Sequence, residues 1–131
     1  MTRAEGAPRH LLEMARGLLR RADPATAGLW PRASALLARQ ALEAGVRELW
    51  ARRELALQGC PMPAQFICLR TYLGDAELAA RAGHAWSALS RACHHHAYEL
   101  APTAGELDDW FRVVGELIQK AGPSPAGPAR S

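Results

Sequence analysis

The sequence predicts an all-α protein, a single-domain, up-and-down bundle of about five helices. Three observations predict this fold. Apolar residues recur at steps of three and four residues almost throughout, which is the spacing of amphipathic helices, and no strand-like alternation persists. Alanine, leucine and arginine, which favour helices, are over-used. The 131 residues, 49% of them hydrophobic, suffice for one domain with a core and are too few for two.

Two helices are predicted in the first half of the chain. The first begins near Pro8, because proline suits a first helical turn, and ends where Asp23 and Pro24 interrupt the apolar pattern. The second is long and covers about residues 32–57. It carries small residues on one face that would let a neighbouring helix approach closely: Ala35, Ala38 and Gly45.

The next two predicted helices are separated by a glycine and an aspartate. A short helix over about residues 64–73 is closed by Gly74 as its C-terminal cap. Asp75 is a natural N-cap for the fourth helix, whose apolar pattern continues until Pro102 forbids it. The three consecutive histidines of the chain are therefore expected on the last turns of the fourth helix.

The fifth helix has the clearest amphipathic pattern. Thr103 and Glu106 match a capping box, and an apolar face follows them up to about residue 120. The tail 121–131 consists mainly of glycine, proline and alanine with nothing to bury, so we expect it to be disordered. The domain is thus predicted to be a helical bundle over residues 8–120.

Composition and motifs exclude several classes of protein. No apolar run approaches the roughly twenty residues that span a bilayer, and the N-terminus does not resemble a secretory signal, so we expect a soluble, cytoplasmic protein without a membrane partner. Three cysteines without a C-x-x-C pair indicate reduced thiols: Cys60, Cys68 and Cys93. The absence of a glycine-rich strand–turn–helix motif excludes Rossmann and P-loop nucleotide enzymes.

The formal net charge of +3 is mildly basic. Of the sixteen basic residues only Lys120 is a lysine, and the arginine excess is attributed to a GC-rich genome. Arginines and glutamates intersperse one another on the second predicted helix, as they do on a solvated face.

The segment 90–99 gathers chemically active side chains: three of the five histidines, a cysteine, an arginine, a tyrosine and a carboxylate. Metal binding is one interpretation. Adjacent helical residues are turned by about 100° from each other, so His94, His95 and His96 cannot converge on one ion. Cys93 and His96 share a face, but further ligands are not identifiable. The sequence therefore predicts neither a metal site nor a cofactor.

Acid–base chemistry on RNA is a second interpretation. An imidazole can take the proton of a 2′-hydroxyl or protonate the leaving oxygen, and a guanidinium can hold the charged phosphorus centre. Arg91 and His96 fit these tasks, although they are about 140° apart around a helix. His95 is closer to Arg91 in projection, so helix geometry leaves both histidines open as its partner.

The pattern formed by Arg91, His96 and Tyr98 is similar to the R-x4–6-H-x-Y signature of HEPN domains, small helical bundles of prokaryotic RNase toxins and related defence proteins. The resemblance covers residues 8–120 in layout and residues 91–98 in sequence. It implies a homodimer in which two motif helices face each other across a basic cleft and cut RNA without a metal. Arg91 and His96 would be the catalytic pair.

The same resemblance implies a regulator. Tyr98 matches the tyrosine that a nucleotidyltransferase antitoxin modifies with AMP in toxin–antitoxin systems of this family. A bulky anionic adduct beside Arg91 would block a phosphate site.

Other interpretations of the same residues stay open. The position after Arg91, commonly polar in active HEPN nucleases, is Ala92, which favours an inactive HEPN-like bundle that binds nucleotide, RNA or a protein partner. His96 also fits a core histidine, whereas His94 and His95 are expected to face solvent and could contact RNA. Four tryptophans lie at core spacings, which favours packing over base stacking: Trp30, Trp50, Trp86 and Trp110.

Overall fold

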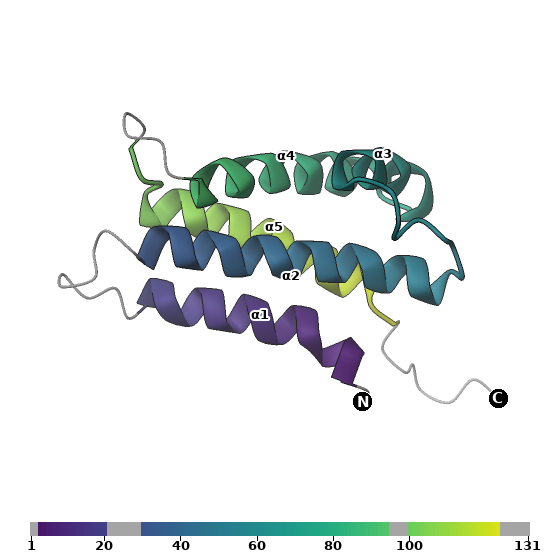
Figure 1. The fold of residues 1–131 in the computed structure, drawn as a ribbon, viewed down its shortest axis with the longest axis horizontal. Coiled ribbons are helices and arrows are strands. Elements are labelled where there is room, and N and C mark those ends of the chain that lie inside the picture. The colour runs from purple at the N-terminus through teal and green to yellow at the C-terminus, as the bar shows by residue number, and fades with distance from the viewer. Residues whose placement is uncertain (1–2, 21–29, 95–99, 124–131) are drawn as a thin grey trace.

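The computed structural model describes residues 3–20, 30–94 and 100–123. Over these residues the chain forms five helices and no strand, which confirms the predicted all-α single domain (Figure 1). None of these helices is long and apolar enough to cross a membrane. In chain order they are α1 (Arg3–Arg20), α2 (Trp30–Arg52), α3 (Met62–Tyr72), α4 (Ala76–Cys93) and α5 (Ala104–Ala121).

Helix α2 is the centre of the bundle. It contacts all four other helices, and Figure 1 shows it running lengthwise between α1 and α4. Helix α5 lies against α2 and also contacts α1 and α4, while α3 folds over the far end of α4. All five helices contribute large, fully buried side chains: Pro8, Leu42, Val46, Leu49, Trp50, Gln65, Leu69, Leu89, Leu107, Phe111, Val114 and Leu117.

Small residues on α2 allow its neighbours to come close. Ala35, Ala38 and Gly45 are all buried. A Cβ atom placed on Gly45 would lie 3.2 Å from both Ile118 Cγ1 and Leu117 Cδ1 of α5, closer than ordinary van der Waals contact. The close approach predicted from the sequence is therefore confirmed, and α5 is the helix that makes it at Gly45.

The bounds of the first two helices differ from the prediction. Helix α1 begins at Arg3, so Pro8 lies inside it, where it removes one backbone hydrogen bond and its ring is fully buried. Helix α2 ends at Arg52, because the chain turns at Glu54, whose φ of 55° is left-handed. The turn brings Leu55 back against the core, and its N–H donates to the carbonyl of Trp50 at 2.9 Å.

The predicted caps are confirmed. Gly74 follows α3 with a φ of 80°, a conformation that glycine adopts without strain. The carboxylate of Asp75 accepts a hydrogen bond from the N–H of Leu78 at 3.0 Å at the start of α4. At the start of α5 the Thr103 hydroxyl accepts from Glu106 N–H at 3.1 Å, and the Glu106 carboxylate accepts from Thr103 N–H at 3.0 Å.

The predicted end of α4 is wrong. The helix stops at Cys93, and His94 is extended, with φ −86° and ψ 138°. The N–H of His94 donates to the carbonyl of Arg91 at 3.2 Å, a contact three residues back that closes the last turn. Histidine is a weak helix former, which is consistent with the helix ending before His94. Residues 100–102, which precede the capping box of α5, are not helical either. His94 thus lies at the cap and not on the last turns of the helix.

Several predicted features fall beyond the part of the chain that the structure describes. They are His95, His96, Tyr98 and most of the tail 121–131. Ala121, the first residue of that predicted tail, belongs to α5, and its side chain is buried.

A buried polar pair joins α2 to α3. The indole N–H of Trp50, fully buried, donates to Gln65 Oε1 at 2.9 Å. The amide nitrogen of Gln65 donates to the carbonyl of Cys60 at 2.7 Å, and the Gln65 side chain is only 1% exposed. Gln65 therefore satisfies polar groups of both α2 and the turn before α3.

Replacing Gln65 by methionine should destabilise the fold. The change keeps the length of the side chain but leaves a buried donor on Trp50 and the Cys60 carbonyl without partners. Each unsatisfied buried group costs about 1–3 kcal/mol, so the free energy of unfolding in urea should fall by about 2 kcal/mol or more. Gln40→Met, on the exposed face of α2, is the matched control and should change it by less than about 0.5 kcal/mol. Equal urea midpoints for the two variants would contradict this account.

Candidate functional site

A hollow of about 650 Å³ opens at the end of the bundle where α2 begins, α4 ends and α5 begins. This volume lies in the range of small-molecule pockets, roughly 300–1,000 Å³. We call it the end hollow. Its lining residues are Arg32, Ala88, Arg91, Ala92, His94, Leu100, Ala101, Pro102, Thr103, Glu106 and Trp110.

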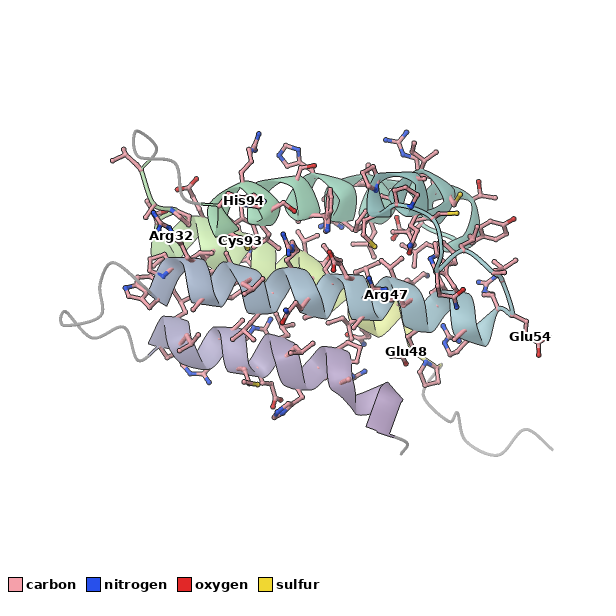
Figure 2. All side chains as sticks on the ribbon, in the orientation of Figure 1. Arg32, Arg47, Glu48, Glu54, Cys93 and His94 are labelled. Carbon is pink, nitrogen blue, oxygen red and sulfur yellow. The ribbon has the colours of Figure 1, made fainter. Side chains whose placement is uncertain are left out.

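Three basic side chains line the end hollow. Arg91, exposed, comes from the last turn of α4, and His94 caps that helix. Arg32, half-buried, comes from the first turn of α2. Figure 2 shows Arg32 and His94 at the same end of the bundle. Guanidinium groups bind phosphate through paired N–H donors, so this arrangement suits an anionic ligand.

The opposite wall of the end hollow is the start of α5. Glu106 contributes a carboxylate, which is engaged by the backbone N–H of Thr103 in the capping box. Trp110, one turn further along α5, is half-buried and is one of the residues that line the hollow. Two guanidinium charges against one carboxylate leave the hollow net positive.

In the described part of the chain, the two arginines of the end hollow have no carboxylate partner. Among the residues that the structure describes, no ion pair involves Arg32 or Arg91. Other arginines are paired: Arg81 lies 3.0 Å from Glu116, and Arg112 lies 3.2 Å from Asp108. The charges at the hollow are therefore available to a ligand.

A separate polar cluster lies between α2 and α4. Glu43 lies 3.8 Å from Arg39 and 3.9 Å from Arg47, and its carboxylate accepts a hydrogen bond from the Trp86 indole N–H at 3.0 Å. The Glu43 side chain is only 16% exposed, so this part of α2 is not the fully solvated face that the alternating charges indicated. Arg39 and Glu43 thus serve the packing of α2 against α4.

Cys93 borders this cluster at the end of α4. Burial raises the pKa of its thiol, the nearby charge of Arg39 lowers it, and the charge of Glu43 raises it. The net shift is upward, so the thiol stays protonated at neutral pH. All three cysteines are free in the structure: Cys60, Cys68 and Cys93.

The structure brings together some of the residues predicted for the site. Arg91, Ala92 and His94 all line the end hollow. The predicted catalytic histidine His96, its alternative His95 and the modification candidate Tyr98 lie outside the described residues, directly after His94 in the chain. No group of three histidine, cysteine or acidic side chains within the described part of the chain is placed to hold a metal ion.

Sequence reasoning missed Arg32 and Trp110. Both are distant in sequence from Arg91, and their relation to it depends on the start of α2 and the start of α5 meeting the end of α4. The only local signal concerned Arg32. It lies in the first turn of α2, where acidic residues are normally favoured and none is present.

Comparison with known proteins adds no relative. No protein-family model, no curated protein and no solved structure matches the chain. The resemblance to HEPN domains therefore stays a prediction from the sequence pattern of Arg91, His96 and Tyr98.

The Cys93 thiol should ionise at higher pH in the folded protein than in the unfolded chain. In the double variant Cys60→Ser/Cys68→Ser, which leaves Cys93 as the one thiol, the pH midpoint of iodoacetamide alkylation should be higher in buffer than in guanidinium chloride. Glu43→Gln should lower the folded midpoint, because it removes a negative charge that raises the pKa. A folded midpoint at or below the unfolded one would refute the burial of this thiol.

Proposed function

We propose that the chain is a HEPN-type, metal-independent endoribonuclease, with Arg91 and His96 acting on the RNA phosphodiester. The observation that supports the proposal most is the end hollow, where Arg91 and Arg32 present unpaired guanidinium groups beside His94. The motif histidine His96 follows His94 by two positions. A phosphate held in the hollow would therefore lie near the segment that carries the motif.

The proposed reaction needs only groups of the chain and the RNA itself. The 2′ oxygen attacks the neighbouring phosphorus, and the bond from phosphorus to the 5′ oxygen breaks. His96 takes the 2′-hydroxyl proton or protonates the leaving 5′ oxygen. Arg91 stabilises the added negative charge at phosphorus. The products are a 2′,3′-cyclic phosphate and a 5′-hydroxyl.

A second candidate function is an inactive HEPN-like bundle that binds nucleotide, RNA or a protein partner. Ala92 favours it, because this residue lines the end hollow at a position where active family members commonly carry a polar side chain. A methyl group can neither donate nor accept a hydrogen bond. The hollow would then bind a phosphate group without catalysing cleavage of the phosphodiester.

The proposed partners follow from the same resemblance. A homodimer would place two end hollows near one cleft and pool the small net charge of +3 per chain for RNA binding. A nucleotidyltransferase antitoxin would silence the enzyme by adding AMP to Tyr98, and the nuclease would serve as a toxin or a defence component.

Cutting of mixed RNA by the purified protein in EDTA tests the proposed activity. Arg91→Ala and His96→Ala should each slow cutting by at least about a hundredfold, the usual effect of losing a catalytic acid–base or charge-stabilising group. Arg70→Ala and His10→Ala, both on exposed positions outside the end hollow, are matched controls and should cut at the wild-type rate. Intact RNA with the wild-type protein at high concentration, or undiminished cutting by His96→Ala, would end the nuclease proposal and favour the inactive binder.

The dimer is tested separately by multi-angle light scattering at the concentration of the cutting assay. The expected mass is twice that of one chain. A single-chain mass at that concentration would rule out a site shared between two copies.

A further inference from the structure

Trp110 differs from the two tryptophans that close the core. Trp50 and Trp86 donate their indole N–H groups to Gln65 and Glu43. In the described part of the chain the indole of Trp110 has no hydrogen-bond acceptor, and its ring is half-buried at the wall of the end hollow. The Trp110 N–H is not among the buried polar atoms that lack a partner, so this donor reaches the surface. Because Trp110 is one of the residues that line the end hollow, the exposed part of its indole is available to a ligand there.

The positive charge of Arg32 does not stabilise the helix that carries it. It lies in the first turn of α2, which contains no acidic residue. The N-terminus of a helix is electrically positive, so an arginine there is mildly unfavourable for the helix. The helix end and the guanidinium together raise the positive potential on one wall of the end hollow, whose other walls carry Arg91 and Trp110.

We propose that Arg32 and Trp110 form a nucleotide subsite beside Arg91, in which an unpaired base stacks on the Trp110 indole and Arg32 holds the phosphate of that nucleotide. The hollow of about 650 Å³ is large enough for one nucleotide. A base can offer its face to an aromatic side chain only when it is not stacked within a duplex. The substrate class is therefore single-stranded RNA, and the subsite fixes the nucleotide next to the phosphate that Arg91 holds. The inference rests on the proposed ribonuclease function for the role of Arg91.

Binding is measured with the full chain in EDTA and a fluorescent single-stranded RNA of about eight nucleotides, 2′-O-methylated throughout. Such an RNA lacks the attacking hydroxyl and is not cut. Trp110→Leu should weaken binding roughly tenfold, the usual loss when a stacked base loses its aromatic partner. Arg32→Ala should weaken it most at low salt, because a phosphate contact is lost.

Matched variants separate the subsite from general effects. Arg70→Ala removes an exposed arginine of α3, and Tyr72→Leu removes a partly exposed aromatic ring of α3, at the other end of the bundle (Figure 1). Both should bind the oligonucleotide like wild type. Trp110→Phe keeps a stacking ring and should bind nearly as well as wild type, whereas the quenching of tryptophan fluorescence by the RNA should largely disappear. The quenching measurement on Trp110→Phe tests base stacking on Trp110 even if Trp110→Leu fails to fold.

Three binding results would overturn the subsite. They are unchanged affinity in both Arg32→Ala and folded Trp110→Leu, equal affinity for a duplex of the same sequence, and tighter binding of 5′-AMP than of the oligonucleotide. Failure of the nuclease proposal looks different. The protein would then bind the methylated RNA through Arg32 and Trp110 but cut no unmodified RNA. Cutting that depends on Arg91 and His96 but not on Arg32 or Trp110 would instead refute the subsite alone.

Discussion

The packing of α2 is the constraint on which the structure depends. Its buried alanines and Gly45 offer almost no side-chain volume, so neighbouring helices can lie close to its backbone. Contact of α2 with all four other helices follows from this shape. The large buried residues of α2, Leu42, Leu49 and Trp50, then fill the space further from its axis. Small and large residues on one helix thereby fix both the spacing of the bundle and its core.

This arrangement also creates the end hollow. Helix α2 begins at the end of the bundle where α4 stops and α5 starts, so residues far apart in sequence share one surface. The early stop of α4 at Cys93 contributes, because His94 and residues 100–102, which line the hollow, are not helical. The feature that the sequence predicted wrongly is thus the one that opens the candidate site.

The fold was more predictable than the site because its signals are local. Gly74, Asp75 and the Thr103–Glu106 capping box act within a few residues of themselves, and each was confirmed. The end of α2 was not predicted, since the left-handed turn at Glu54 has no glycine to mark it, and the return of Leu55 to the core sets it. Arg32 and Trp110 could not be assigned to the site, because their relation to Arg91 is a property of helix ends that meet only in the folded chain.

The combination of lining residues distinguishes the end hollow from the polar cluster between α2 and α4. Glu43 forms ion pairs with Arg39 and Arg47 on α2. It also accepts a hydrogen bond from Trp86 of α4, so this cluster is part of the packing between the two helices. The end hollow contains one carboxylate, Glu106, and the backbone of Thr103 already engages it. Other described arginines, such as Arg70, also have no carboxylate partner. What sets Arg32 and Arg91 apart is that they share one hollow with Trp110. A concave positive surface beside an aromatic ring favours a phosphate that carries a base over a simple anion, because only the former uses both.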